Sequence, residues 1–144
     1  MSVLDNIQIE VAARRPLVTG NALPLLYEIK HGLQHLSDTG EPTILDLRAI
    51  PFGPGDEERL LSVLGAGEVS ATINVLGEST VKETGFPAVW LVEHKNSDNE
   101  RIALQIEITE VPAILKTQPG DLADSLTHLN DTLCDFEDED GAIS

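Results

Sequence analysis

The chain has 144 residues and a formal net charge of −16 at pH 7, and only 3% of its residues are aromatic. This length suits one domain that buries about two thirds of the unfolded surface, around an aliphatic core. The single cysteine excludes an internal disulfide and a cysteine-only metal or iron–sulfur site. The acidic charge argues against nucleic acid as a partner and allows a basic protein surface.

The first 19 residues read as an N-terminal arm or strand, because residues 7–11 alternate between apolar and polar types. They do not resemble a signal peptide, and no stretch of the chain approaches the roughly 18 apolar residues of a membrane span. We therefore expect a cytoplasmic protein that does not contact a membrane.

Two helices are predicted before the main sheet. The first follows a cap at Asn21, and its apolar residues recur at spacings of three and four: Leu25, Leu26, Ile29, Leu33 and Leu36. A short strand follows at residues 43–48. The second helix spans residues 56–64, with three acids in its first turn, where the helix dipole favours them.

Residues 65–112 predict four antiparallel strands with one apolar face. Alternation of apolar and polar residues indicates strands at 69–76 and 102–109, a shorter strand lies at 80–84, and the apolar run 88–94 suits a strand buried on both faces. Residues 96–99 have the composition of a hairpin turn.

A terminal amphipathic helix is predicted from apolar residues spaced four, three, four and three apart: Leu122, Leu126, Leu129, Leu133 and Phe136. The acidic residues 137–140 should fray as a solvated tail. We therefore expect an α+β fold with an arm at 1–19, a single domain at 20–136 and an acidic tail at 137–144. The domain should hold a mostly antiparallel sheet of four to five strands packed with about three helices.

Glu28, His31 and His35 share one side of the first predicted helix. Two histidines four residues apart can chelate a metal, but no third strong ligand is specified, so a solvated polar face is the simpler interpretation.

Glutamates near Trp90 are the candidates for acid–base chemistry. Glu68, Glu83 and Glu107 are each predicted in a strand, and strand parity places Glu68 and Glu107 on a polar sheet surface. Neither the glycines of 53–55 nor Gly65 and Gly67 match a phosphate-binding loop. No catalytic signature results, and no cofactor is predicted.

Four strings of the sequence resemble the HupH/HyaF family of hydrogenase expression or formation proteins. They read Ile-Pro-Phe-Gly-Pro-Gly at 50–55, Leu-Gly-Ala-Gly-Glu-Val-Ser at 64–70, Lys-Glu-Thr-Gly-Phe-Pro-Ala-Val-Trp at 82–90 and Ile-Glu-Ile-Thr-Glu-Val-Pro at 106–112. Each string is weak alone, and together, in this order, they are specific. Members of this family are often about twice as long, so the chain resembles a single-domain version of its conserved region.

The resemblance implies a non-enzymatic accessory role in the maturation of a [NiFe] uptake hydrogenase, with its iron–sulfur small subunit as the favoured partner and other maturation proteins as further partners. It implies no catalytic residues. We interpret Gly65 and Gly67 as structural glycines at a helix-to-strand turn. Trp90 suits a core or an interface, and Glu68, Glu83 and Glu107 are candidates for an acidic recognition surface beside it.

Three alternatives stay open at this stage. A nickel or iron carrier would use Glu28, His31 and His35, and a small-molecule enzyme would use the glutamates near Trp90. A transcriptional role is the weakest, because no basic DNA-contacting helix is present. The sequence also leaves open whether the chain forms a homodimer.

Overall fold

The computed structural model describes residues 20–143, so the predicted arm at 1–19 and its strand at 7–11 lie outside the described residues. The elements follow in the order α2 (Ala22–Thr39), β1 (Thr43–Asp46), the short helix η2 (Leu47–Ala49), α3 (Asp56–Leu64), β2 (Ser70–Asn74), β3 (Glu78–Glu83), β4 (Val89–Lys95), β5 (Arg101–Ile108), the short helix η3 (Ala113–Leu115) and α4 (Pro119–Ile143).

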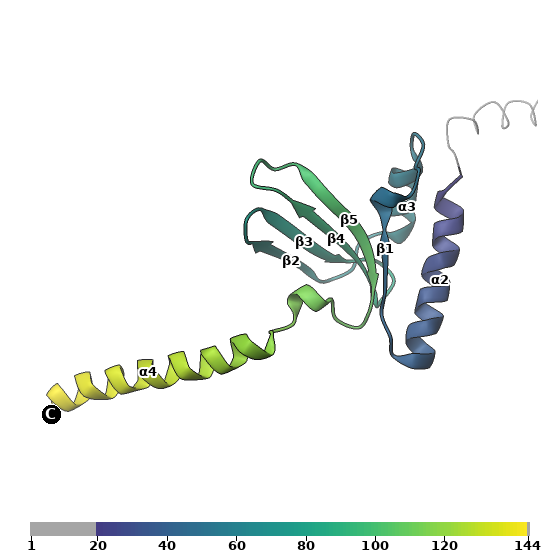
Figure 1. Ribbon diagram of the computed structural model, residues 1–144. Coiled ribbons are helices and arrows are strands. Elements are labelled where there is room, and N and C mark those ends of the chain that lie inside the picture. Colours follow the sequence, from purple (N-terminus) through teal and green to yellow (C-terminus); the bar gives the residue numbers. More distant parts are fainter. Residues whose placement is uncertain (1–19, 144) are drawn as a thin grey trace, which may run out of the picture. The chain divides into compact units, whose positions relative to one another are not determined.

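The strands form one five-stranded sheet in the order β1-β5-β4-β3-β2, and every neighbouring pair is antiparallel. Helix α2 runs beside β1 and β5, and α3 lies next to α2 (Figure 1). The chain divides into two compact units after Pro112. The first unit therefore holds the whole sheet with α2 and α3, and the second holds η3 and α4.

The main core lies between one face of the sheet and the two helices. Helix α2 contributes Leu25 and Ile29, and α3 contributes Leu60 and Leu64. The opposing sheet face supplies residues from β4 and β5: Val89, Leu104, Ile106 and Ile108. The spacing of three and four in the first helix and the alternation in the last strand are both confirmed, because each pattern directs its apolar residues to this core.

Helix α2 packs against β5 at Gly32, which is buried. A Cβ atom built there would lie 2.5 Å from Ile108 Cδ1 and 3.5 Å from Thr43 Cβ. A larger residue would therefore have to displace the buried Ile108 side chain or shift the helix.

The opposite face of the sheet carries a second set of buried residues. Val81 and Val92 are register partners on β3 and β4 and are almost fully buried. Trp90 lies on the same face and is 6% exposed. The prediction that residues 88–94 are buried on both faces is confirmed for Val89, Trp90 and Val92.

The β4–β5 hairpin turn is held by Asn96. Its Oδ1 accepts hydrogen bonds from the backbone N–H groups of Asp98 (3.0 Å) and Glu100 (2.9 Å). Asn99 takes the left-handed conformation with φ 65°. These are the two properties of asparagine on which the hairpin prediction depended.

Helix α4 differs from the prediction at its end. It continues through Ile143, so residues 137–140 are helical instead of forming a frayed tail, although they are exposed as expected. The apolar stripe runs along this helix, and its five side chains are all exposed. Among the described helices, none combines the length and apolar character needed to cross a bilayer.

The α+β class and the antiparallel sheet are confirmed, and α3 has the predicted bounds. One strand begins later than expected. Glu68 precedes β2, which starts at Ser70, so the prediction that Glu68 lies in a strand is wrong. The reason is that Glu83 pairs with Gly67 through its carbonyl and with Val69 through its N–H, so the ladder passes over Glu68, whose N–H bonds to the Glu83 side chain instead.

Replacing a core residue of α3 tests this packing. Leu60→Ala should lower the free energy of unfolding by about 2–5 kcal/mol, because Leu60 is fully buried and the change leaves a cavity. The control Leu23→Ala alters a side chain that is 60% exposed and should change stability by less than about 0.5 kcal/mol. Urea unfolding followed by the fluorescence of Trp90, the one tryptophan, measures both. Equal effects of the two changes would contradict the described core.

Candidate partner-binding surface

Three of the four residues predicted for a recognition surface form one row across the sheet. Trp90 is the register partner of Glu83 on β3 and of Glu107 on β5. Residues paired in this way place their side chains on the same face. The fourth residue joins the row from the loop before β2, where the Glu68 backbone N–H donates to Glu83 Oε1 at 3.2 Å.

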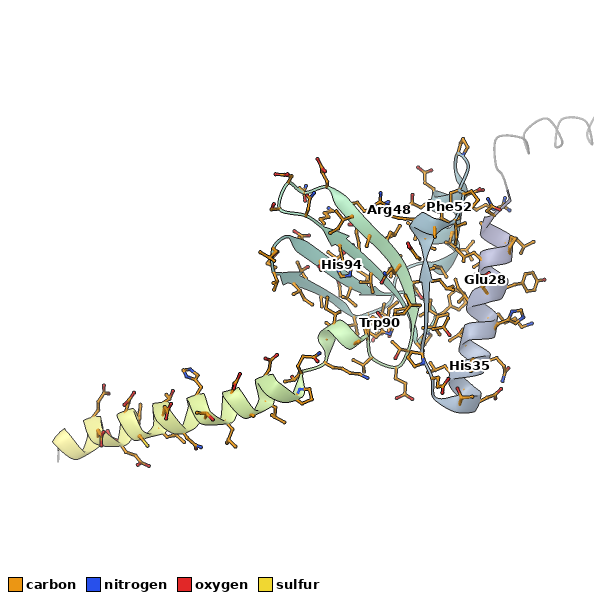
Figure 2. The ribbon with its side chains drawn as sticks, in the orientation of Figure 1. Glu28, His35, Arg48, Phe52, Trp90 and His94 are labelled. Carbon is orange, nitrogen blue, oxygen red and sulfur yellow. The ribbon has the colours of Figure 1, made fainter. Side chains whose placement is uncertain are left out.

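Burial limits what this row can present to a partner. Trp90 lies within the fold (Figure 2), is 6% exposed, and donates its indole N–H to Thr109 O at 3.1 Å. Glu107 is 7% exposed, so its predicted place on a polar sheet surface is wrong. The physical reason is its place on an inner strand: β5 lies between β1 and β4, and the register partner of Glu107 on β4 is the buried Trp90. Glu68 is exposed and Glu83 is half-buried.

The two glycines that precede this row are required by the backbone. Gly65 ends α3 with φ 65°, a conformation that favours glycine. At Gly67 a Cβ atom would lie 2.5 Å from both Glu83 Oε1 and Thr84 O. The chain can therefore pass close to the end of β3 only without a side chain at this position.

The candidate metal ligands of α2 do not form part of a cluster, among the described residues, that could hold a metal ion. Glu28, His31 and His35 are all exposed on α2, and His35 Nε2 lies 3.2 Å from Glu41 Oε2. Within residues 20–143, no group of three His, Cys, Asp or Glu side chains is arranged to hold a metal ion. The spacing of the two histidines thus places them on a solvated helix face.

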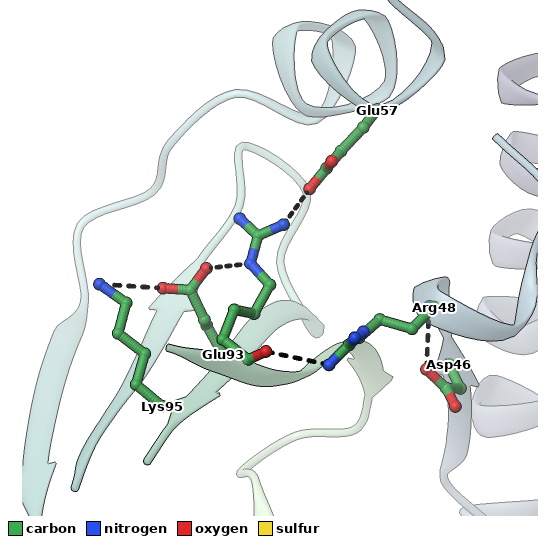
Figure 3. Close-up of polar contacts among 6 residues, drawn as sticks. Asp46, Arg48, Glu57, Glu93 and Lys95 are labelled. Atoms are coloured by element: carbon green, nitrogen blue, oxygen red, sulfur yellow. Dashed lines mark hydrogen bonds and ion pairs between the residues drawn. The ribbon is translucent and has the colours of Figure 1, made fainter. Parts of the chain in front are cut away.

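A hollow of about 340 Å³ lies over η2, α3 and the start of β5. Arg101 lines it, with Nη1 2.8 Å from Glu57 Oε1 and Nε 2.8 Å from Glu93 Oε2, two of the contacts drawn in Figure 3. Burial of the Arg101 guanidinium lowers its pKa, but the hydrogen bond to Glu93 and the nearby Glu57 carboxylate have the larger combined effect, so the pKa of Arg101 is raised. Arg48 donates to Arg101 O at 3.0 Å. These polar contacts tie α3 and η2 to the β4–β5 hairpin, so we assign them a structural role.

An apolar groove lies between α2, the end of α3 and the β3–β4 loop. Its volume is about 510 Å³. Apolar residues from three segments line it, namely Leu26, Ile29 and Leu33 of α2, Leu64 of α3, and Phe86 of the loop. The remaining lining residues are Lys30, Gln34 and Ser37, so no acid lines the groove of this strongly acidic chain.

The loop that carries Phe86 is fixed by Thr84 and Gly85. The Thr84 hydroxyl accepts the Phe86 N–H at 3.1 Å and lies 2.9 Å from Val89 O, to which it donates. The Gly85 N–H donates to Leu64 O at 2.7 Å, which joins the loop to the end of α3. Phe86 is nevertheless 46% exposed. A large apolar side chain is thus held beside the groove on an ordered loop.

Sequence reasoning missed this groove. The helical spacing places Leu26 and Leu33 on the core stripe, and it does not reveal that they lie at the edge of the core. The one signal was Phe86 between Gly85 and Pro87, because a phenylalanine in a turn cannot be buried as readily as one in a strand.

The comparisons with known proteins agree with one another. The family model described as HupH hydrogenase expression protein, C-terminal conserved region, matches residues 19–135. Hydrogenase expression/formation protein HoxQ of Cupriavidus necator is 30% identical over 113 residues, and hydrogenase-1 operon protein HyaF of Escherichia coli is 27% identical over 112 residues. These matches cover 78% and 77% of the chain, and 40% and 38% of the relatives, so the chain spans about two fifths of their length.

A solved structure shares this fold. Hydrogenase expression protein HupH from Thiobacillus denitrificans is 43% identical and superposes with a TM-score of 0.79, over 82% of this chain and 98% of the other.

The buried role of Trp90 can be tested by removing its polar group. Trp90→Phe should lower the free energy of unfolding by about 1–3 kcal/mol, because Thr109 O loses its donor and the smaller ring leaves space. Thermal unfolding followed by circular dichroism measures this change. A variant as stable as the parent would argue that Trp90 is not part of the core.

Gly67→Ala should destabilise the first unit by about 1–3 kcal/mol, because the new methyl group would overlap the backbone oxygen of Thr84. Gly120→Ala is the control, since a Cβ atom there meets nothing within 4 Å. Urea unfolding curves of the two variants, compared with the parent, give the result. An unchanged midpoint for Gly67→Ala would refute the close approach.

Proposed function

Because the chain belongs to the family of HupH hydrogenase expression proteins, we propose that it is an accessory protein of hydrogenase formation that holds an incompletely matured hydrogenase subunit. The iron–sulfur small subunit is the favoured partner. The observation that carries this proposal is the apolar groove between α2 and Phe86, which is open to solvent and lined without acids.

The groove has the properties of a surface that binds a peptide segment or a helix of another protein. Its floor is formed by Ile29 and Leu64, which are nearly fully buried, and Phe86 stands half-exposed beside it. Leu26 and Leu33 of α2 are half-buried along its wall. An apolar helix laid into such a groove would bury these side chains together with its own.

A subunit that lacks its cluster or its partner subunit exposes apolar surface. Covering that surface stabilises the bound state by mass action and needs no chemical step. The groove supplies the apolar contact, while the charge of −16 over the whole chain favours approach of a partner with a basic rim. Release would follow when the mature subunit buries the same surface.

Neither the metal-carrier alternative nor the small-molecule-enzyme alternative is supported by a comparable observation among the described residues. The three candidate metal ligands of α2 are exposed and separate from any described three-residue cluster. Of the glutamates near Trp90, Glu107 is buried and Glu83 accepts the backbone N–H of Glu68.

Capture experiments test the proposal. The tagged chain should retain the separately expressed small subunit more strongly when that subunit lacks its clusters, and it should retain the large subunit weakly. Phe86→Glu should weaken this capture at least about tenfold, because it places a charge in the apolar contact.

Ile102→Glu is the matched control, since Ile102 is 56% exposed on β5 and lies outside the groove. It should change capture less than about twofold. Failure of the folded parent chain to capture either subunit would contradict the holding role. Equal losses for the two variants would contradict the assignment to the groove.

A further inference from the structure

The second compact unit carries an apolar stripe that nothing described covers. The five stripe residues are Leu122, Leu126, Leu129, Leu133 and Phe136, and their exposures are 66%, 62%, 56%, 49% and 63%. In proteins, most of the stability of a helix comes from packing of its apolar face against another surface. We therefore expect another surface to pack against the stripe.

The spacing of the stripe residues indicates which kind of element packs against them. Intervals of four, three, four and three repeat every seven residues, as at positions a and d of a coiled coil, with Leu126 and Leu133 at a and the other three at d. This seam is narrower than the apolar face of a helix that lies on a globular core. It fits one further helix.

The residues beside the seam indicate which helix this is. Positions e and g of the first two heptads are neutral: Ala123, Ser125, Asn130 and Thr132. At 100° per residue, Asp124, Asp131 and Asp135 lie within about 40° of the direction opposite to the stripe. A basic partner helix would be matched by acids at e and g, where they would meet its lysines and arginines. Neutral flanks instead allow an identical helix to approach.

We infer that α4 pairs with α4 of a second copy of this chain in an antiparallel coiled coil. Antiparallel pairing follows from the end of the helix, where Glu137 and Glu139 flank the seam and Asp140 lies on it. A parallel pair would bring these acids together, and residues 117–144 contain no Lys or Arg to compensate them. The antiparallel pair places them at opposite ends. This inference is independent of the groove, which belongs to the first unit.

Sedimentation equilibrium of the full chain tests the pairing. Between about 1 and 200 μM, a range that resolves micromolar dissociation constants, the chain should pass from monomer to dimer. Added NaCl should strengthen the dimer, because it screens the repulsion between two acidic copies. The double variant Leu126→Asp/Leu133→Asp should dissociate at least about tenfold more readily, since it places charges in the seam.

The matched control is Thr127→Asp/Cys134→Asp, which adds the same two charges away from the seam and should leave the dissociation constant within about threefold. Fluorescence of the buried Trp90 shows whether the first unit of each variant remains folded. A parent chain that stays monomeric throughout, or a dimer that resists the seam variant, would overturn the inference. So would a monomer whose stripe is needed only to bind a basic protein.

The orientation has its own measurement. Spin labels at Glu139→Cys, in a Cys134→Ser background, should lie more than about 20 Å apart in the antiparallel dimer, given a rise of 1.5 Å per residue. A separation near 10 Å would indicate parallel helices and overturn the antiparallel assignment.

Discussion

The close packing of α2 on β5 is the constraint from which the first unit and its groove follow. Because Gly32 has no side chain, the backbone of α2 can lie directly against the side chains of Ile108 and Thr43. At this short distance Leu25 and Ile29 reach the core fully. The apolar face of α2 is wider than the area covered by the sheet and α3, so Leu26 and Leu33 remain half-buried at its edge. The groove beside Phe86 is thus a result of the position of α2 on the sheet.

Local patterns predicted much of this fold, and contacts between distant segments account for what they missed. The alternation of residues 102–109 predicted β5, and the glycine after Leu64 predicted the end of α3, because the bounds of both elements depend on nearby residues. The exposure of Glu107 was wrongly predicted because its burial depends on the neighbouring strands, including its buried register partner Trp90 on β4. The same reason explains the groove, since Leu64 and Phe86 meet through the hydrogen bond from Gly85 to Leu64. Glu68, Glu83, Trp90 and Glu107 lie together, but how far each is exposed could not be read from the sequence.

The distribution of charge distinguishes the two proposed binding surfaces. The groove lies on an acidic chain and has only Lys30 as a charged lining residue, so a basic partner surface can surround an apolar contact there. On α4 the acids face away from the stripe over most of its length, and a like-charged helix can therefore approach. A dimer formed through α4 would present two grooves, and a partner with two apolar segments would bind such a dimer more tightly than a monomer.

Hydrogen exchange of the chain, with and without the cluster-free small subunit, would show whether the groove is the holding surface. We expect slower exchange on binding in residues 26–37 of α2 and in the loop at 84–88, because a docked segment would cover the groove that they form. The hairpin turn at 96–99 should exchange at the same rate in both samples. Binding that protects the hairpin or the sheet and leaves α2 and the Phe86 loop unchanged would contradict the assignment of the groove as the holding surface.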